Sequence, residues 1–239
     1  GFMKFGGTGA DGALTITSGT TSVDLGGAAI VIKNYTSISI TGTGKLAFTN
    51  PHADGTVVVL KSMGNVTLTS SQAPMIDCSS LGAQTGGTGG SRGSGPANQY
   101  GTNGNGGVTP LLNTGGGEGV GSGGVNNGGT APTAYNFSVA YHAFQNLIQK
   151  YPKMFLGGAG GGGQAVYTSG SGGSIVGGNG GKGGGCLIIE CAGSWNFTTA
   201  GGISVAGANG TNAIFSAGPS TYNAGCGGGG GGGFFLALY

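Results

Sequence analysis

The chain has 239 residues, of which 62 are glycine, and only 6% of its residues are charged, which leaves a formal net charge of +2. Its 37% of hydrophobic residues can bury a core, so wholesale disorder is excluded, but its 8 scattered Lys and Arg residues cannot form the basic stripe of a nucleic-acid-binding protein. No apolar run approaches the roughly 18 residues that a membrane-spanning helix needs, so we expect no membrane span.

Residues 1–81 form the first predicted region, which is rich in threonine and β-branched residues. Polar and apolar residues alternate in segments such as 14–17, 38–41 and 66–69, and this period of two is typical of half-buried strands. Turn residues recur roughly every 8 to 12 residues between such segments, as in β-sandwiches and β-solenoids. The runs 28–32 and 57–60 are apolar on both faces, so we expect them at the centre of a sheet.

Residues 82–129 form the second region, in which glycine follows a period of three. The same period returns as Gly-Gly-X over 177–185. Collagen shares it but needs proline-rich X and Y positions, which the 7 prolines of the chain do not supply. We predict polyglycine II helices of about three residues per turn, which bond to one another through backbone N–H groups and point X residues such as Asn179 and Lys182 outward. A flexible glycine linker is the alternative.

Residues 130–239 form a mixed region that we expect to fold as one unit with residues 1–81. Apolar residues at helical spacing predict one short helix over Ser138–Tyr151, which Pro152 ends. Short apolar runs then predict strands, the last of which, 234–239, follows a run of glycines. The predicted fold class is all-β: a Thr/Val/Ile-rich β-sandwich or β-solenoid core with polyglycine II-like segments and one short helix.

The titratable residues do not form the pattern of a catalytic site. The chain has 6 carboxylates and 2 histidines, and His52 and Asp54 lie together in a turn-like stretch between two predicted strands. The sequence has no nucleophile elbow, Walker loop or zinc-ligand spacing, and its Gly-x-Gly-x-x-Gly matches lack the strand-then-helix context of a nucleotide site. We predict that the protein is not an enzyme and has no catalytic residue, cofactor or metal site.

The 4 cysteines suggest disulfides in an exported chain. We predict a bridge between Cys186 and Cys226, because both border glycine tracts that a bridge would hold together; free buried thiols are the alternative. Asn-x-Ser/Thr sequons are weak evidence for N-glycosylation, because Ser and Thr are frequent in this sequence. The sequons lie at Asn34, Asn65, Asn136, Asn196 and Asn209.

The opening residues from Phe5 to Thr21 read FGGTGADGALTITSGTT. They resemble the start of a group of glycine-rich surface and phage tail-fibre-like proteins from viral and uncultivated prokaryotic genomes, in which Thr-rich strands and then glycine-rich blocks follow. The glycine blocks are also similar to those of the adhesin tips of some tailed phages and of glycine-rich antifreeze proteins, which pack polyglycine II helices. The resemblance implies a structural or adhesive role without catalytic residues.

The expected function is that of a non-catalytic extracellular structural protein, a self-assembling subunit of a surface filament or fibre whose partners are copies of itself. Its apolar ends would add strands to a neighbouring copy, as in donor-strand assembly. The residues expected to do so are Phe2, Phe5, Phe234, Phe235, Leu236, Leu238 and Tyr239. The alternative is a glycine-rich adhesin or tail-fibre receptor-binding module that binds cell-surface glycans. Both functions place the protein outside the cell, on a cell or virion surface.

Overall fold

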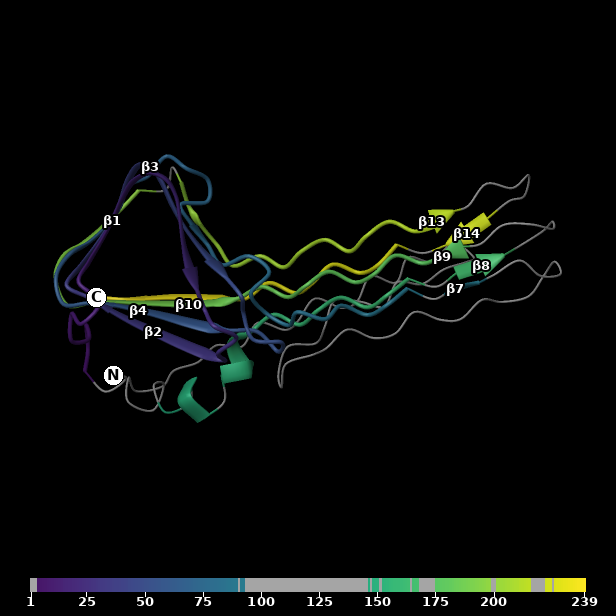
Figure 1. Cartoon of the computed structure of the whole chain (residues 1–239), viewed down its shortest axis with the longest axis horizontal. Coiled ribbons are helices and arrows are strands. Elements are labelled where there is room, and N and C mark those ends of the chain that lie inside the picture. Colours follow the sequence, from purple (N-terminus) through teal and green to yellow (C-terminus); the bar gives the residue numbers. More distant parts are fainter. Residues whose placement is uncertain are drawn as a thin grey trace.

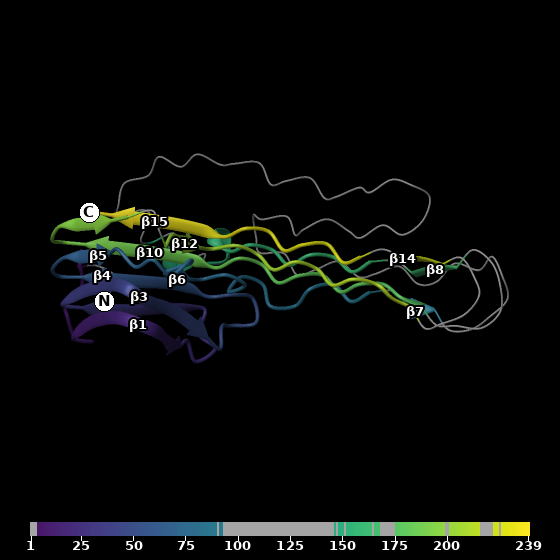
Figure 2. The same ribbon diagram turned by 90° about the horizontal axis from the view of Figure 1, so that it is seen from above.

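A computed structural model describes residues 4–89, 91–92, 146, 148–150, 152–163, 165–167, 175–198, 201–215, 222–224 and 226–239. A core of strands occupies one end of the molecule, and extended glycine-rich segments run side by side from it to the other end (Figures 1 and 2). The core strands pair mostly in parallel, which confirms the β-rich prediction.

The core contains strands from both halves of the sequence. They are β1 (Ala13–Asp24), β2 (Ile30–Tyr35), β3 (Ser37–Thr49), β4 (Val57–Ser62), β5 (Val66–Leu68), β6 (Ile76–Asp77), β10 (Cys186–Cys191), β11 (Trp195–Phe197), β12 (Ile203–Ser204) and β15 (Phe234–Leu238). Short elements elsewhere are β7 (Ser91–Arg92), η1 (Pro152–Phe155), β8 (Ala165–Tyr167), β9 (Ile175–Val176), β13 (Ile214–Phe215) and β14 (Tyr222–Ala224).

Two parallel sheets build the core. The first has 6 strands in the order β11-β5-β3-β6-β12, with β1 paired to β3, and the second has 4 strands in the order β15-β10-β4-β2. The chain alternates between the two sheets, and each pass lays its strands beside those of the previous pass in matched register, for example Leu14 beside Ile38 and Ile38 beside Val66. Equivalent residues of successive passes therefore form rows along the direction in which the strands stack.

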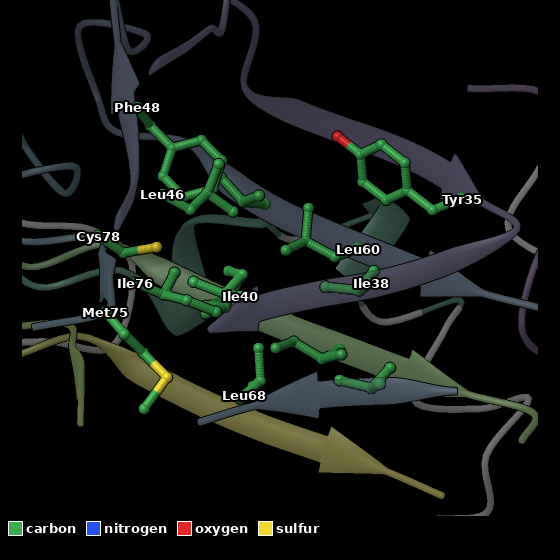
Figure 3. Close-up of a cluster of buried hydrophobic side chains, with 14 of the residues drawn as sticks. Tyr35, Ile38, Ile40, Leu46, Phe48, Leu60, Leu68, Met75, Ile76 and Cys78 are labelled. Carbon is green, nitrogen blue, oxygen red and sulfur yellow. The ribbon is translucent and has the colours of Figure 1, made fainter. Parts of the chain in front are cut away.

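The rows that point between the two sheets are apolar and buried. Four of these side chains are completely buried: Ile40 and Leu68 from the first sheet, and Leu60 and Leu187 from the second. Figure 3 shows such side chains converging from both sheets into one cluster. Burial of each Leu or Ile side chain contributes about 1.5–3 kcal/mol, so these rows hold the passes together. The alternation read in residues 1–81 is the local cause of this packing.

The outer face of the second sheet is also covered, which explains its strands that are apolar on both faces. Val57 and Val59 of β4 pack in a second cluster with Ile148 and Phe155. Of the helix predicted over 138–151, residues 146 and 148–150 are helical, and the other residues of that prediction lie outside the described part. The structure confirms the prediction of a central position for 57–60, because β4 lies between β2 and β10.

The same prediction was wrong for the run 28–32. Its strand, β2, lies at the edge of the second sheet, and Ile30 and Ile32 are only half-buried. The reason is its place in the chain, because β2 belongs to the first pass and no earlier strand covers its other edge.

A buried ion pair pins the N-terminal residues to the outer face of the second sheet. Lys61 of β4 and Glu190 of β10 are register partners, and their Nζ and Oε2 atoms lie 3.0 Å apart with 0% and 2% of the side chains exposed. Lys61 Nζ also donates to the carbonyl of Lys4 (2.8 Å), and the backbone N–H of Gly6 donates to Glu190 Oε2 (3.2 Å). Gly6 has a φ of 70° and no space for a side chain, so glycine is required where the chain crosses this pair.

Candidate functional site

Several charged side chains of the described residues join neighbouring elements in pairs. Asp77 pairs with Lys45 (2.7 Å), and Asp11 pairs with Lys33 (3.8 Å). His52 lies in the predicted turn, where its Nδ1 accepts a hydrogen bond from the backbone N–H of Asp54 (3.0 Å). Among the described residues, no group of three or more His, Cys, Asp and Glu residues could hold a metal ion.

The largest structural feature outside the core is a set of extended glycine segments, which we call the glycine bundle. Its described segments are 82–89, 157–163, 177–185, 205–211 and 226–233. They enter the core at one corner, because the chain leaves β6 and β12 of the first sheet to form them and returns to β10 and β15 of the second. In the sequence, the bundle segments are therefore inserted between strands of the first sheet and strands of the second. In space the bundle extends away from the core (Figure 1).

Segment 177–185 lies at the centre of the bundle and bonds to each of the other segments. Its bonds include Gly180 N to Gly87 O (2.8 Å), Gly160 N to Gly181 O (2.7 Å), Ala208 N to Lys182 O (2.8 Å) and Gly184 N to Gly231 O (2.8 Å). Other bonds join the outer segments directly, such as Gly231 N to Gly158 O (2.8 Å). Backbone hydrogen bonds therefore replace side-chain packing in this part of the molecule.

Residues three apart in this central segment face the same neighbouring segment, which explains the period of three in the sequence. The N–H groups of Gly180 and Gly183 donate to segment 82–89, whereas that of Gly181 donates to segment 226–233. A Cβ at any of these glycines would overlap a carbonyl group of a neighbouring segment. Asn179 and Lys182 occupy the remaining position of the period and are exposed, as the Gly-Gly-X pattern predicts.

Short antiparallel strands occupy the end of the bundle away from the core. β9 pairs with β7 and β13, and β8 pairs with β14. Ile214 and Val176 are 68% and 38% exposed there. In the sequence, residues 168–174 connect β8 to β9 and residues 216–221 connect β13 to β14, and both stretches contain hydroxyl-bearing residues and no charged residue.

Hydroxyl-bearing residues form rows on the outer face of the first sheet. Thr15, Ser39, Thr67 and Asn196 are register partners on β1, β3, β5 and β11, and each lies one residue from a side chain that points inward. Four threonines follow two residues further along the chain, Thr17 and Thr41 within β1 and β3, and Thr69 and Thr198 directly after β5 and β11. All eight are exposed or half-buried. Neighbours in the row of Thr15, Ser39, Thr67 and Asn196 lie about 4.8 Å apart. The repeated Thr-x-Thr pattern was a sequence signal for this surface.

The last pass of the core exposes an apolar surface, which we call the C-terminal face. Its residues are Trp195 and Phe197 of β11, Phe235 and Ala237 of β15, and Tyr239. Phe197, Phe235 and Tyr239 are 37%, 38% and 79% exposed. The Trp195 ring stacks on Tyr239, with centroids 5.7 Å apart and planes at 14°, and lies beside Phe197 at 6.4 Å. The sequence interpretation had given no role to Trp195 or Phe197.

The predicted assembly residues at the C-terminus lie in a strand that pairs within its own chain. β15 pairs with β10 in parallel over its whole length, from Phe234 beside Cys186 to Leu238 beside Glu190. Leu236 packs against the cluster on the outer face of the second sheet. In this structure the segment is therefore not a free donor strand. Near the other terminus Phe5 is 38% exposed, and Phe2 lies outside the described residues.

The cysteines are free thiols, so the predicted Cys186–Cys226 bridge was wrong. Segments 177–185 and 226–233 run in parallel, because Gly227 packs beside Asn179 and Gly233 packs beside Gly185. Cys226 is therefore level with Gly178, eight residues before Cys186. At about 3.1 Å per residue, Cys226 and Cys186 are roughly 25 Å apart along the bundle, far beyond the Cα separation of about 7 Å that a disulfide allows. Burial raises the pKa of the Cys78 and Cys186 thiols, which keeps both unreactive.

The sequons differ in their exposure. Asn65, Asn196 and Asn209 are exposed and Asn34 is half-buried, whereas Asn136 lies outside the described residues. The amide oxygen of Asn65 accepts a hydrogen bond from the backbone N–H of Ser194 (2.9 Å), so a sugar at this position would have to displace a structural contact.

Comparison of the chain with protein-family models, with curated proteins and with solved structures gives no match. In the described part of the chain, no helix has the length and apolar character needed to cross a membrane.

Proposed function

We propose that this protein is a non-catalytic surface-binding module in which a β-solenoid base carries a rod of polyglycine II helices, and that the far end of the rod contacts a target surface. The observation that carries the proposal is the glycine bundle. Its segments bond to one another through the backbone at every third residue and extend from one corner of the core.

The solenoid interpretation rests on the order of the strands. The chain returns to each sheet on every pass and pairs the new strand in parallel with the previous one. β-Sandwiches of the immunoglobulin type pair consecutive strands antiparallel, so the stacking favours a solenoid over a sandwich.

The polyglycine II interpretation accounts for both the composition and the stiffness of the rod. Ordering each residue costs about 1–2 kcal/mol, and glycine has no side chain whose burial could compensate. Hydrogen bonds on several sides of each segment offset that loss and fix the segments relative to one another. Such a rod holds the short strands β8, β9, β13 and β14 at its end away from the base, which is the geometry that a receptor-binding module needs.

We further propose that the target is a cell-surface glycan and that the protein acts at a cell or virion surface. The sequence offers hydroxyl groups and no charged side chain in the connections 168–174 and 216–221, which join the short strands β8 to β9 and β13 to β14. Groups that both donate and accept hydrogen bonds match the hydroxyls of sugars.

A filament subunit is the second candidate, supported by the low proportion of charged residues and by the edge strands at both ends of the described core. The donor-strand form of that candidate does not fit this structure, because β15 completes the sheet of its own chain.

The test is binding of the full chain to a glycan array and to cells, compared with a variant in which residues 168–174 and 216–221 are replaced by Gly-Ser stretches of equal length. The matched control replaces Thr15 and Thr67 of the base with alanine. We expect the first replacement to lose most of the binding and the control to retain it, with unchanged circular dichroism. Binding to neither array nor cells, or binding that survives the first replacement, would overturn the proposal.

A further inference from the structure

We propose that the C-terminal face is a docking site for a second copy of this chain, with the same surface used by both copies. This inference concerns the base of the molecule and is independent of what the end of the rod binds.

The first observation is an open strand edge. The backbone N–H of Phe234 donates to Gly185 O (3.0 Å), so the backbone groups of Phe234 point toward β10. In a parallel pair the backbone groups of every second residue point toward the same neighbour. The backbone groups of Phe234, Leu236 and Leu238 therefore face β10, and those of Phe235 and Ala237 face away from the sheet. Among the strands of the described residues, β15 is the last of its sheet, and β11 and β12 end the other sheet. Such an edge is a template for an added strand.

The second observation is the exposure of side chains that belong to interior rows. Phe235 continues the row of Leu187, and Trp195 continues the row of Val66. Leu187 and Val66 are fully buried because the next pass covers them, whereas Phe235 is 38% exposed and Tyr239, beyond it, is 79% exposed. The C-terminal face is thus the interior of the core exposed at its last pass.

The third observation is the absence of charge. Glu190 is the last charged residue in the sequence, so neither the C-terminal face nor the strands that frame it carry a charged side chain. Natural proteins protect open edges with charged residues or proline. A two-fold interface brings each side chain close to its own copy, so any charge would meet a like charge. A surface without charged side chains is compatible with this symmetry.

The opposite end of the core also has an edge strand, β2, but its side chains differ from those of the C-terminal face. Among the interior residues of the first pass, Ile16 and Leu25 are each only 3% exposed, and Leu14, Val23 and Val31 are half-buried. Asp11, Asp24 and Lys33 lie beside them, and Asp11 pairs with Lys33. The contrast favours a closed dimer through two C-terminal faces over a head-to-tail fibre. In that dimer the two β15 strands run antiparallel, and the two glycine bundles point in opposite directions.

The test is sedimentation velocity of the full chain across a concentration series, with negative-stain microscopy of the largest species. We expect a monomer–dimer equilibrium and particles with a bundle on each side. Tyr239→Lys adds a charge at the most exposed residue of the face, and Ala237→Pro removes an N–H from the open edge while it leaves the bonds of β15 to β10 intact. Each should raise the dimer dissociation constant at least tenfold.

The matched control is Thr21→Lys, at an exposed position on β1 at the other end of the core, which should leave the dissociation constant unchanged. A chain that is monomeric at every concentration would overturn the proposal. Open fibres that Thr21→Lys disrupts would also overturn it, because they would establish head-to-tail contact. Glycan binding by the rod is measured separately. A chain that does not dimerise can still bind glycans through the rod, and a chain that binds no glycan can still dimerise through the C-terminal face.

Discussion

Replacement of Gly183 by alanine should destabilise the protein although glycine-to-alanine changes often do the opposite. Gly183 lies in the central segment of the bundle, where its N–H donates to Ala83 O (2.9 Å) and its carbonyl accepts from Gly82 N (2.8 Å). A Cβ there would overlap the carbonyl group of Gly157 in a third segment. Gly157 itself donates to Gly184 O (2.8 Å), so the segments must separate to make room.

The expected magnitude follows from these contacts. Overpacking of a tight site costs about 1–3 kcal/mol, and weakening one or two of the hydrogen bonds adds about 1 kcal/mol each. We therefore expect Gly183→Ala to lower the free energy of unfolding by roughly 2–5 kcal/mol. The measurement is urea unfolding followed by circular dichroism, with the urea dependence checked for a constant slope.

The matched control is Gly232→Ala in the same bundle. A Cβ at Gly232 meets nothing within 4 Å, and the residue is exposed. Its replacement restricts only the unfolded chain, so it should be neutral or stabilise by about 0.4–1 kcal/mol. Equal effects of the two changes would refute the reasoning, because they would mean that the bundle does not require glycine at the positions that face its neighbours.

Two further predictions concern the ion pairs of the core. Glu190→Gln deprives the buried Lys61 ammonium of its carboxylate and should lower the free energy of unfolding, measured in urea, by about 3–5 kcal/mol. The double change Lys61→Met with Glu190→Leu leaves no buried charge and should lower it less. An equal or greater loss in the double variant would contradict this account. Burial alone would raise the pKa of Asp77, but hydrogen bonds from Lys45 and Ser79 outweigh it and lower the pKa below its usual range. The unfolded chain then binds the proton more tightly, so the stability from this pair is present above about pH 4 and is lost as the pH falls through the lowered pKa. Lys45→Met should weaken that acid dependence in unfolding curves recorded from pH 5 downward, and an unchanged pH profile would argue against the pair.

Local chemistry fixed several features that could be predicted from the sequence. The alternation in residues such as 14–17 and 38–41 depends only on the period of an extended strand, so the strands and their inward-facing residues followed from it. The Gly-Gly-X period likewise depends on the geometry of a single three-residue turn. This is why Asn179 and Lys182 could be placed on the outside of the bundle without knowledge of its neighbours.

The partners of these segments depend on contacts between distant residues, which only the tertiary structure could decide. Lys61 and Glu190 meet because β4 and β10 are adjacent passes, although a long excursion separates them in the sequence. Cys186 and Cys226 both border glycine, but the register of the bundle sets them far apart. The apolar character of the last strand can be read from the sequence. Its pairing with β10 of its own chain depends on the strands that are already stacked beside it in the fold. Period and propensity are properties of one segment, and pairing is a property of two, which is why the sequence determined the elements and the tertiary structure determined their neighbours.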